Sequence, residues 1–364
     1  MTTNRRLNYA DMVKGIAILC IVIYHLIAPG AVRNVMTHLV DSMLMVFFFY
    51  SGYFHKPGKR SMGENLKVRA KALLVPFFKY SIFFWIVGSA YLLITKSETL
   101  MEALYCLRNF YAGCIWNRVI QNWFGWEYYS LGKRYFFLAD FWFLIALFFS
   151  SVLFFLIVDR TASKVKTAVT VVILFVITGI CKAASIDLPY NIQLVPFWTA
   201  FMLLGAASGR EKLFEKPLFS GTSGWFVSLA LLAAGVAVSM WKEPATNLFR
   251  GTFGSSEIAG MLLCILAAIL IIPGLSGLCM LVEKTGKIRV KELSWLGSHS
   301  LLIYLYHMFF AWALCTITGF SMNYQEPVSG EVMAGSILLI SGSLGLVILR
   351  YAIRDRIAVI RKNE

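Results

Sequence analysis

The sequence predicts an all-α fold: a polytopic membrane helix bundle with about ten transmembrane helices and both termini in the cytoplasm. Hydrophobic residues make up 59% of the 364 residues and charged residues only 15%. A soluble domain is about 25% charged and about 45–50% apolar. The mean hydropathy is +0.70. The apolar residues gather in runs long enough to cross a bilayer, which takes about 20 residues.

Ten such runs follow one another along the chain: residues 12–29, 35–54, 73–95, 135–158, 167–184, 192–208, 224–241, 257–281, 296–318 and 331–350. An even number of crossings places both termini on one side. Lys and Arg concentrate in the segments that this count assigns to the cytoplasm, as the positive-inside rule requires. The same rule accounts for the net charge of +15, so we expect no nucleic-acid partner.

Two connections are longer than the others. Residues 61–72 are polar and basic and predict an interfacial cytoplasmic helix, with a kink near Pro76 at the start of the next span. Residues 95–134 are assigned to the outside and are rich in Trp and Tyr, including Trp126. These aromatic side chains mark either the membrane interface or a lid that stacks on a sugar. We expect residues 1–364 to form a single integral-membrane domain with no fused soluble domain.

Ionisable residues inside the first apolar run predict a functional site. Asp11, Lys14 and His25 fall on one face of a helix, and such groups are costly in a membrane unless they face a cavity or the bundle interior. His307, in the ninth run, is expected at a similar depth to His25. Each histidine either bonds to a neighbouring helix or, in the case of His25, acts as a general base that Asp140 would orient. Asp11 is too distant from His25 and is expected to pair with Lys14.

The other histidines, His38, His55 and His299, lie near the ends of runs and are expected to be solvated or interfacial. Lys14, Arg69 and Lys71 form a basic group at the inner face, suited to phosphate, although positive-inside topology also explains part of it. The sequence contains no zinc-ligand cluster and no glycine-rich phosphate loop, so no metal is expected.

Several motifs resemble the acyltransferase-3 family of integral-membrane acyltransferases, including its sugar O-acetylase branch. In chain order they are Lys14-x10-His25, Phe48-Phe49-Tyr50-Ser51-Gly52-Tyr53, the basic segment from Arg69 to Pro76, Trp142-Phe143-Leu144, and Gly297 with Ser300-x3-Tyr304-x2-His307. The chain departs from the family pattern in two places. Lys14 replaces the commoner Arg, and Ala72 stands where a second Arg would follow Arg69. Lysine offers phosphate a point charge without the bidentate fork of arginine.

The resemblance implies transfer of an acetyl or other short acyl group from cytoplasmic acyl-CoA to a hydroxyl of a cell-surface glycan or its lipid-linked precursor. It also implies a multi-pass protein of the bacterial cytoplasmic (inner) membrane, with acetyl-CoA as donor. The implied partners are acyl-CoA, a glycan or glycolipid and membrane lipid, and a homo-oligomer stays open. The implied site residues are His25 and Asp140 for catalysis, Lys14, Arg69, Lys71 and Ser51 for the donor, and Trp142, Tyr304, His307 and Trp126 for the acceptor.

Two other classes compete with an acyltransferase. A glycan-lipid or proton-coupled transporter would also have many spans and intramembrane His and Asp residues. Against it, the sequence has no half-chain repeat and no matched pair of broken helices, both frequent in transporters. A non-enzymatic membrane scaffold would not explain why Lys14 and His25 lie on one face of an apolar helix.

Overall fold

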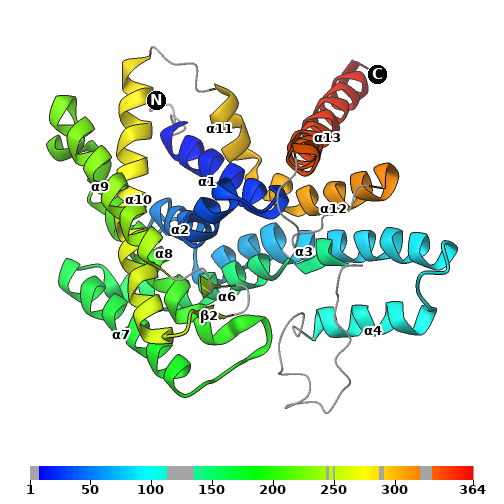
Figure 1. The fold of residues 1–364 in the computed structure, drawn as a ribbon. Helices are drawn as coiled ribbons and strands as arrows, with labels where there is room; N and C mark the ends of the chain where they lie inside the picture. Colours follow the sequence, from blue (N-terminus) through cyan, green and yellow to red (C-terminus); the bar gives the residue numbers. More distant parts are fainter. Residues whose placement is uncertain are drawn as a thin grey trace. The chain divides into compact units, whose positions relative to one another are not determined.

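A computed structural model describes residues 8–112, 135–139, 141–242, 246–248, 251–286, 291–319 and 330–363. The described residues are almost entirely helical, which confirms the all-α prediction (Figure 1). Ten helices among them are long and apolar enough to cross a membrane, and each overlaps one of the ten predicted runs. The chain divides into two compact units, which we call the first unit (residues 1–40 and 289–364) and the second unit (residues 41–288).

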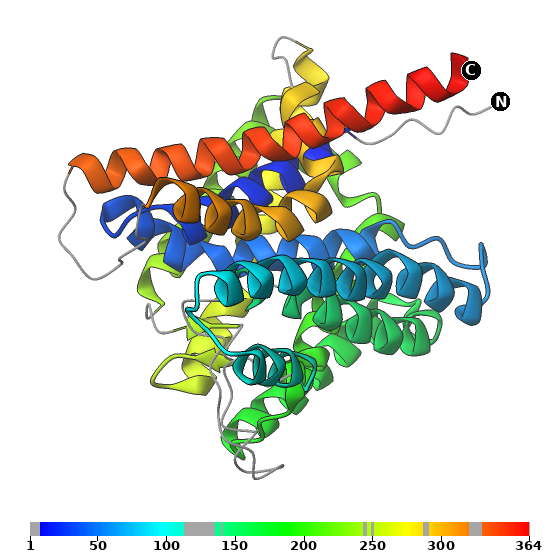
Figure 2. The same ribbon diagram turned by 90° about the vertical axis from the view of Figure 1, so that its right-hand side faces the viewer.

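The first unit joins the two ends of the chain. It contains α1 (Asn8–Leu26), the start of α2 (Ala31–Tyr53), α11 (Lys291–Ser298), α12 (Ser300–Thr318) and α13 (Gly330–Asn363). α1 packs against α11 and α12, and α12 packs against α13. Figure 2 shows α12 and α13, in orange and red, running side by side. The helix pairs of this unit therefore bring together residues almost 300 positions apart, such as His25 and His307, which are 282 apart.

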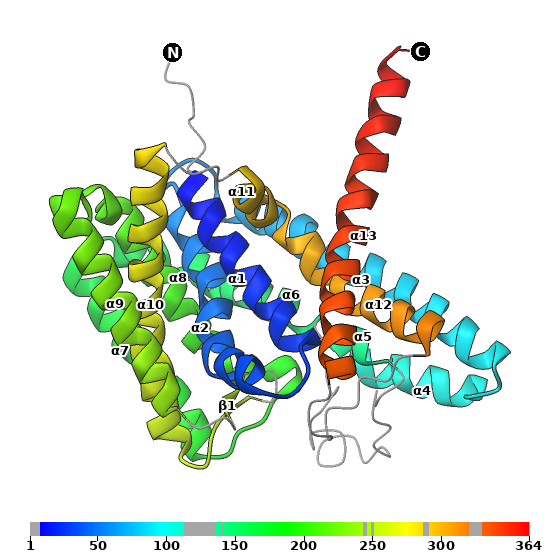
Figure 3. The same cartoon turned by 45° about the horizontal axis from the view of Figure 1, so that its top comes forward.

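The second unit contains the remaining helices: the rest of α2, α3 (Met62–Ile94), α4 (Leu100–Tyr111), α5 (Phe136–Ala139), α6 (Trp142–Ile157), α7 (Lys164–Ala183), α8 (Val195–Arg210), α9 (Gly221–Trp241) and α10 (Glu257–Thr285). Two short strands, β1 (Thr246–Asn247) and β2 (Thr252–Phe253), pair antiparallel. α9 packs along α10, as Figure 3 shows, while α6 packs on both α3 and α8. Phe48, Trp142 and Trp198 form the aromatic centre of this core, with the Phe48 and Trp198 rings 5.6 Å apart.

The predicted interfacial helix is not a separate element. Ser61 caps the N-terminus of α3, and Glu64 completes a capping box, so the helix begins at Met62 and continues through Pro76 to Ile94. Proline lacks the N–H of one intrahelical hydrogen bond, but membrane helices tolerate it where neighbours satisfy the released carbonyl. The prediction that residues 61–72 are helical is therefore correct from Met62 on, but the predicted boundary between this helix and the next span does not exist.

The long outer connection contains a helix that folds back. A capping box at Thr99 and Glu102 starts α4, which runs antiparallel to the second half of α3 (Figure 1). Trp85 Nε1 donates to the carbonyl oxygen of Ala103, 3.0 Å away, and the Phe77 and Phe110 rings stack 5.4 Å apart. Residues 113–134, which carry most of the predicted lid including Trp126, lie outside the described residues.

Candidate active site

Two histidines meet within the first unit. Nδ1 of His25, on the last turn of α1, lies 3.0 Å from Nε2 of His307 on α12, and the two rings stack 5.2 Å apart. His307 is fully buried, while His25 is half-buried. The prediction that the two side chains share a depth is confirmed by this contact.

The hydrogen bonds of His307 assign the protons of the pair. Its Nδ1 lies 2.8 Å from the carbonyl oxygen of Tyr304 and 3.2 Å from that of Ile303. Carbonyl oxygens only accept hydrogen bonds, so Nδ1 of His307 carries a proton. In neutral His307, Nε2 is then the acceptor, and Nδ1 of His25 must donate to it. This leaves Nε2 as the unprotonated nitrogen of His25, the atom that can accept a proton.

Further aromatic and charged groups surround His25. The Tyr24 ring lies 5.0 Å from the His25 ring, and the guanidinium of Arg33 lies 5.6 Å above the Tyr24 ring. Arg33 also donates from Nη1 to the carbonyl oxygen of Ile27, 3.0 Å away, which fixes it at the end of α1. Tyr304 is buried, and its carbonyl oxygen holds His307 in place. The His25 and His307 rings therefore lie near the Arg33 guanidinium, which the first unit holds in place.

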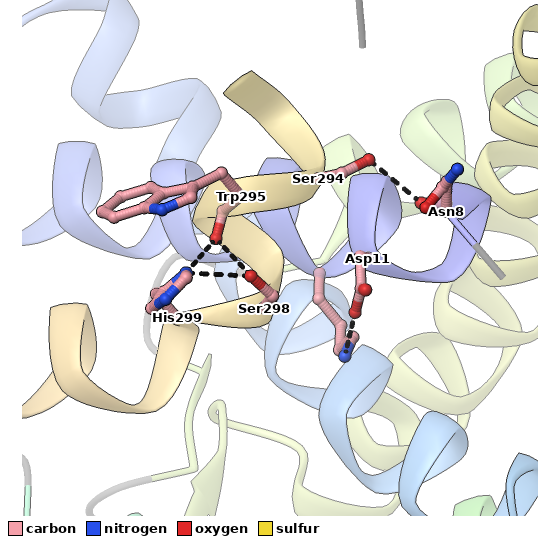
Figure 4. A network of polar contacts seen from close by, with 7 residues as sticks. Asn8, Asp11, Ser294, Trp295, Ser298 and His299 are labelled. Carbon is pink, nitrogen blue, oxygen red and sulfur yellow. Dashed lines mark hydrogen bonds and ion pairs between the residues drawn. The ribbon is translucent and has the colours of Figure 1, made fainter. Parts of the chain in front are cut away.

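At the other end of α1, Asp11 and Lys14 form the predicted ion pair, with the Lys14 Nζ and Asp11 Oδ1 atoms 2.6 Å apart. Figure 4 shows Asp11 and its ion pair next to the network of α11. A β-carbon on Gly297 of α11 would overlap the carbonyl oxygen of Asp11, so glycine is required for this close approach. Lys14 thus has a counter-ion within the chain, which weakens its case as a phosphate ligand.

His299, predicted to be solvated or interfacial, is half-buried and takes part in a packed network where α11 ends and α12 begins. Its ring stacks on Trp295 at 4.3 Å and meets the edge of Tyr351 at 4.3 Å. Its Nδ1 lies 2.8 Å from both the Trp295 carbonyl oxygen and Ser298 Oγ, as Figure 4 shows. These contacts give His299 a structural role at the junction of the two helices.

Two of the predicted donor residues, Ser51 and Arg69, line a cavity of about 260 Å³ in the second unit, together with His55 and Lys59. Arg69 Nη2 donates to the Ser51 carbonyl oxygen, 3.2 Å away, so the guanidinium is held in place. Burial lowers the pKa of His55, and the Asp159 carboxylate opposes this only in part, so its ring is neutral at pH 7.

Of the remaining predicted residues, the structure describes Lys71 and Trp142. Lys71 is exposed and is not among the residues that line the cavity. Trp142 is buried and packs 5.7 Å from Trp198, which gives it a place in the core of the second unit. Asp140 and Trp126 lie outside the described residues. Over the described ranges, no group of three or more His, Cys, Asp and Glu residues is arranged to hold a metal ion.

The interhelical hydrogen bond that the sequence allowed for His307 is present, and its partner is His25. Sequence reasoning missed one feature: it interpreted Lys56, Lys59 and Arg60 only as topology signals, although all three line the cavity with Arg69. The available signal was the run from His55 to Arg60, in which three of six residues are basic and Pro-Gly predicts a turn.

Comparison with known proteins identifies the family. Neither curated proteins nor solved structures give a match to this chain. The acyltransferase-3 family model, described as an acyltransferase domain, matches residues 7–350 and so spans both units. With ten helices suited to crossing a membrane in the described part of the chain, the protein belongs to the acyltransferase-3 family of membrane acyltransferases.

Proposed function

We propose that this protein is an O-acyltransferase that moves an acetyl or other short acyl group from acyl-CoA to a hydroxyl of a cell-surface glycan or its lipid-linked precursor. The observation that carries the proposal is the hydrogen bond between His25 and His307 in a chain of the acyltransferase-3 family. A histidine whose acceptor nitrogen is set by its neighbour is suited to remove a proton from a hydroxyl.

The reaction follows from the assigned protons. Nε2 of His25 takes the proton of the acceptor hydroxyl as its oxygen attacks the thioester carbonyl. The new positive charge on His25 is stabilised because its Nδ1–H already donates to Nε2 of His307. Positive charge from Arg33 would stabilise the oxyanion of the tetrahedral intermediate. When the intermediate collapses, the C–S bond breaks, and the sulfur of CoA leaves with the proton held by His25.

The donor side of the proposal rests on the second unit. Arg69, held by the Ser51 carbonyl oxygen in a basic cavity, is suited to the phosphates of acyl-CoA. By the positive-inside rule we expect this cavity at the cytoplasmic face, where acyl-CoA would be available. The bacterial inner membrane as location, and Asp140, Lys71, Trp142, Tyr304 and Trp126 as further site residues, remain part of the proposal.

The test is to incubate the purified, reconstituted protein with labelled acetyl-CoA and a glycan acceptor. We expect protein-dependent release of CoA, and we expect His25→Ala to lower the rate by about 10²–10⁴-fold, the usual contribution of a general base. A matched control is His299→Gln, a histidine of the same unit that makes structural contacts only among those described. Normal turnover by His25→Ala would remove His25 as the base. Flux of substrate across liposomes without acyl transfer would support a transporter instead.

A further inference from the structure

A tight turn gathers three cations at the mouth of the basic cavity of the second unit. Lys59 N donates to the Lys56 carbonyl oxygen, 3.3 Å away, and Gly58 has a φ of 70°. With Pro57 at its second position and Gly58 at its third, this segment has the signature of a type II turn. The turn brings Lys56 and Lys59 close together, and Arg60 follows directly. We call Lys56, Lys59 and Arg60 the rim cluster.

The rim cluster and Arg69 line the same cavity and differ in exposure. The three rim residues precede α3 and are exposed. Arg69 is seven residues into α3, about 10 Å along its axis from Met62, and is half-buried. The lining, so far as it is described, contains four cations and no carboxylate. Four positively charged side chains that line one cavity repel one another, so an anionic ligand would stabilise them there.

A polar atom of the cavity wall also lacks a partner. The His55 side chain is 9% exposed, and its Nε2 makes no hydrogen bond with any described residue. The closest carboxylate oxygen, Oδ1 of Asp159, is 3.9 Å away, too far for a hydrogen bond. Buried polar groups without partners are uncommon, and one reason for them is a ligand that supplies the missing contact.

The cavity is too small for a whole acyl-CoA molecule. Sites that enclose a complete ligand of drug size measure about 300–1,000 Å³. This cavity measures about 260 Å³, and its lining includes the apolar side chains of Phe54 and Phe155. It therefore suits one end of a larger ligand, an apolar group that carries phosphate.

We propose that this cavity binds the nucleotide end of acyl-CoA, with the rim cluster on the 3′-phosphate and Arg69 on the pyrophosphate. The inference rests on the proposed function, in which acyl-CoA is the donor, and it assigns a phosphate group of acyl-CoA to each cationic group. The exposed rim cations and the half-buried Arg69 offer positive charge to both phosphate groups, and Phe54 and Phe155 offer apolar surface to the adenine. The rim cluster then makes the enzyme select CoA over its 3′-dephospho analogue.

The test uses the full chain in phosphatidylcholine nanodiscs, where no anionic lipid headgroup competes for the rim cluster. KM is measured for acetyl-CoA and for acetyl-3′-dephospho-CoA, for the wild-type protein and for Lys59→Ala/Arg60→Ala. We expect the wild type to prefer acetyl-CoA by about tenfold or more, since charge-assisted hydrogen bonds to a phosphate are lost with the analogue. The double variant should reduce this preference to within about twofold while its KM for the dephospho analogue stays unchanged.

A control variant separates local binding from overall charge. Lys67→Ala/Lys212→Ala removes two exposed cations of the same unit that do not line the cavity, and it should keep the wild-type preference. A preference that survives in Lys59→Ala/Arg60→Ala, or one that is absent from the wild type, overturns the assignment.

A second measurement needs no acyl transfer. Adenosine 3′,5′-bisphosphate should raise the thermal midpoint of the wild-type protein more than adenosine 5′-monophosphate does, and the double variant should lose the difference. If this holds while acetyl-CoA is not consumed, the cavity assignment stands and the proposed acyl transfer fails. If acetyl-CoA is consumed with no preference for the 3′-phosphate, the proposed function stands and the rim assignment fails.

Discussion

Replacing His307 with alanine should slow acyl transfer by about 10- to 100-fold and leave donor binding almost unchanged. The fully buried His307 accepts a hydrogen bond from His25 Nδ1 over 3.0 Å. When His25 takes up a proton, this bond becomes charge-assisted, and such bonds contribute about 1.5–3 kcal/mol. At about 1.4 kcal/mol per tenfold in rate, losing it lowers kcat by roughly one to two orders of magnitude.

The assay measures kcat and KM for acetyl-CoA with reconstituted wild type, His307→Ala, His307→Gln and the double variant His25→Ala/His307→Ala. The glutamine carbonyl oxygen can accept a hydrogen bond from His25 Nδ1–H, so His307→Gln should recover part of the rate. Because His307 is argued to act through His25, the double variant should be no slower than His25→Ala alone. A further drop in the double variant, or an equal loss in His307→Gln and His307→Ala, would refute the reasoning.

Three other substitutions test separate parts of the structure. Arg69→Ala should raise KM for acetyl-CoA about tenfold with kcat within twofold, because it removes a phosphate ligand that the chain holds in place. Gly297→Ala should lower the thermal midpoint, because the added β-carbon forces α11 away from the Asp11 carbonyl, an overpacking cost of about 1–3 kcal/mol. Asp41→Leu should reduce the free energy of unfolding by about 3–5 kcal/mol, because it removes the carboxylate that pairs with the buried Lys242 ammonium.

Each of these predictions has a control within the chain. Lys67→Ala removes an exposed cation outside the cavity and should leave KM unchanged. Gly63→Ala adds a β-carbon with no atom within 4 Å and should not lower the thermal midpoint. Lys212→Met removes a side chain that is 73% exposed and should leave the free energy of unfolding unchanged. A substitution that leaves its measured quantity (KM, thermal midpoint or free energy of unfolding) unchanged, as its control does, would contradict the contact assigned to that residue.

The ten spans and the depth of the two histidines could be predicted because both follow from properties of single helices. Run length gives the number of crossings, and the helical rise converts residue number into depth. The Asp11–Lys14 pair follows in the same way from one turn of helix. None of these inferences needs to know which helices are neighbours.

The other features depend on tertiary contacts. Which nitrogen of His25 faces His307 is decided by the packing of α1 against α12, and this decides which atom can act as a base. Pro76 indicated a kink because the local effect of proline is known, whereas the packing that allows α3 to continue through it is not visible in the sequence. The cavity around Arg69 likewise needs Phe155 of α6, which is far along the chain from α3 and the turn that precedes it.

The helix that folds back along α3 affects how a topology map of this protein should be read. α4 has 12 residues and a length of about 18 Å, short of the roughly 30 Å of a bilayer core, so it does not count as a crossing. Its apolar residues Leu100 and Leu104 are exposed, as are Phe83 and Ile86 of α3, and such residues suit contact with lipid. Cysteine-labelling reagents would therefore report protection in a stretch that hydropathy assigns to open solvent. If this protection were interpreted as an additional transmembrane helix, the topology map would invert the orientation of every helix after α4.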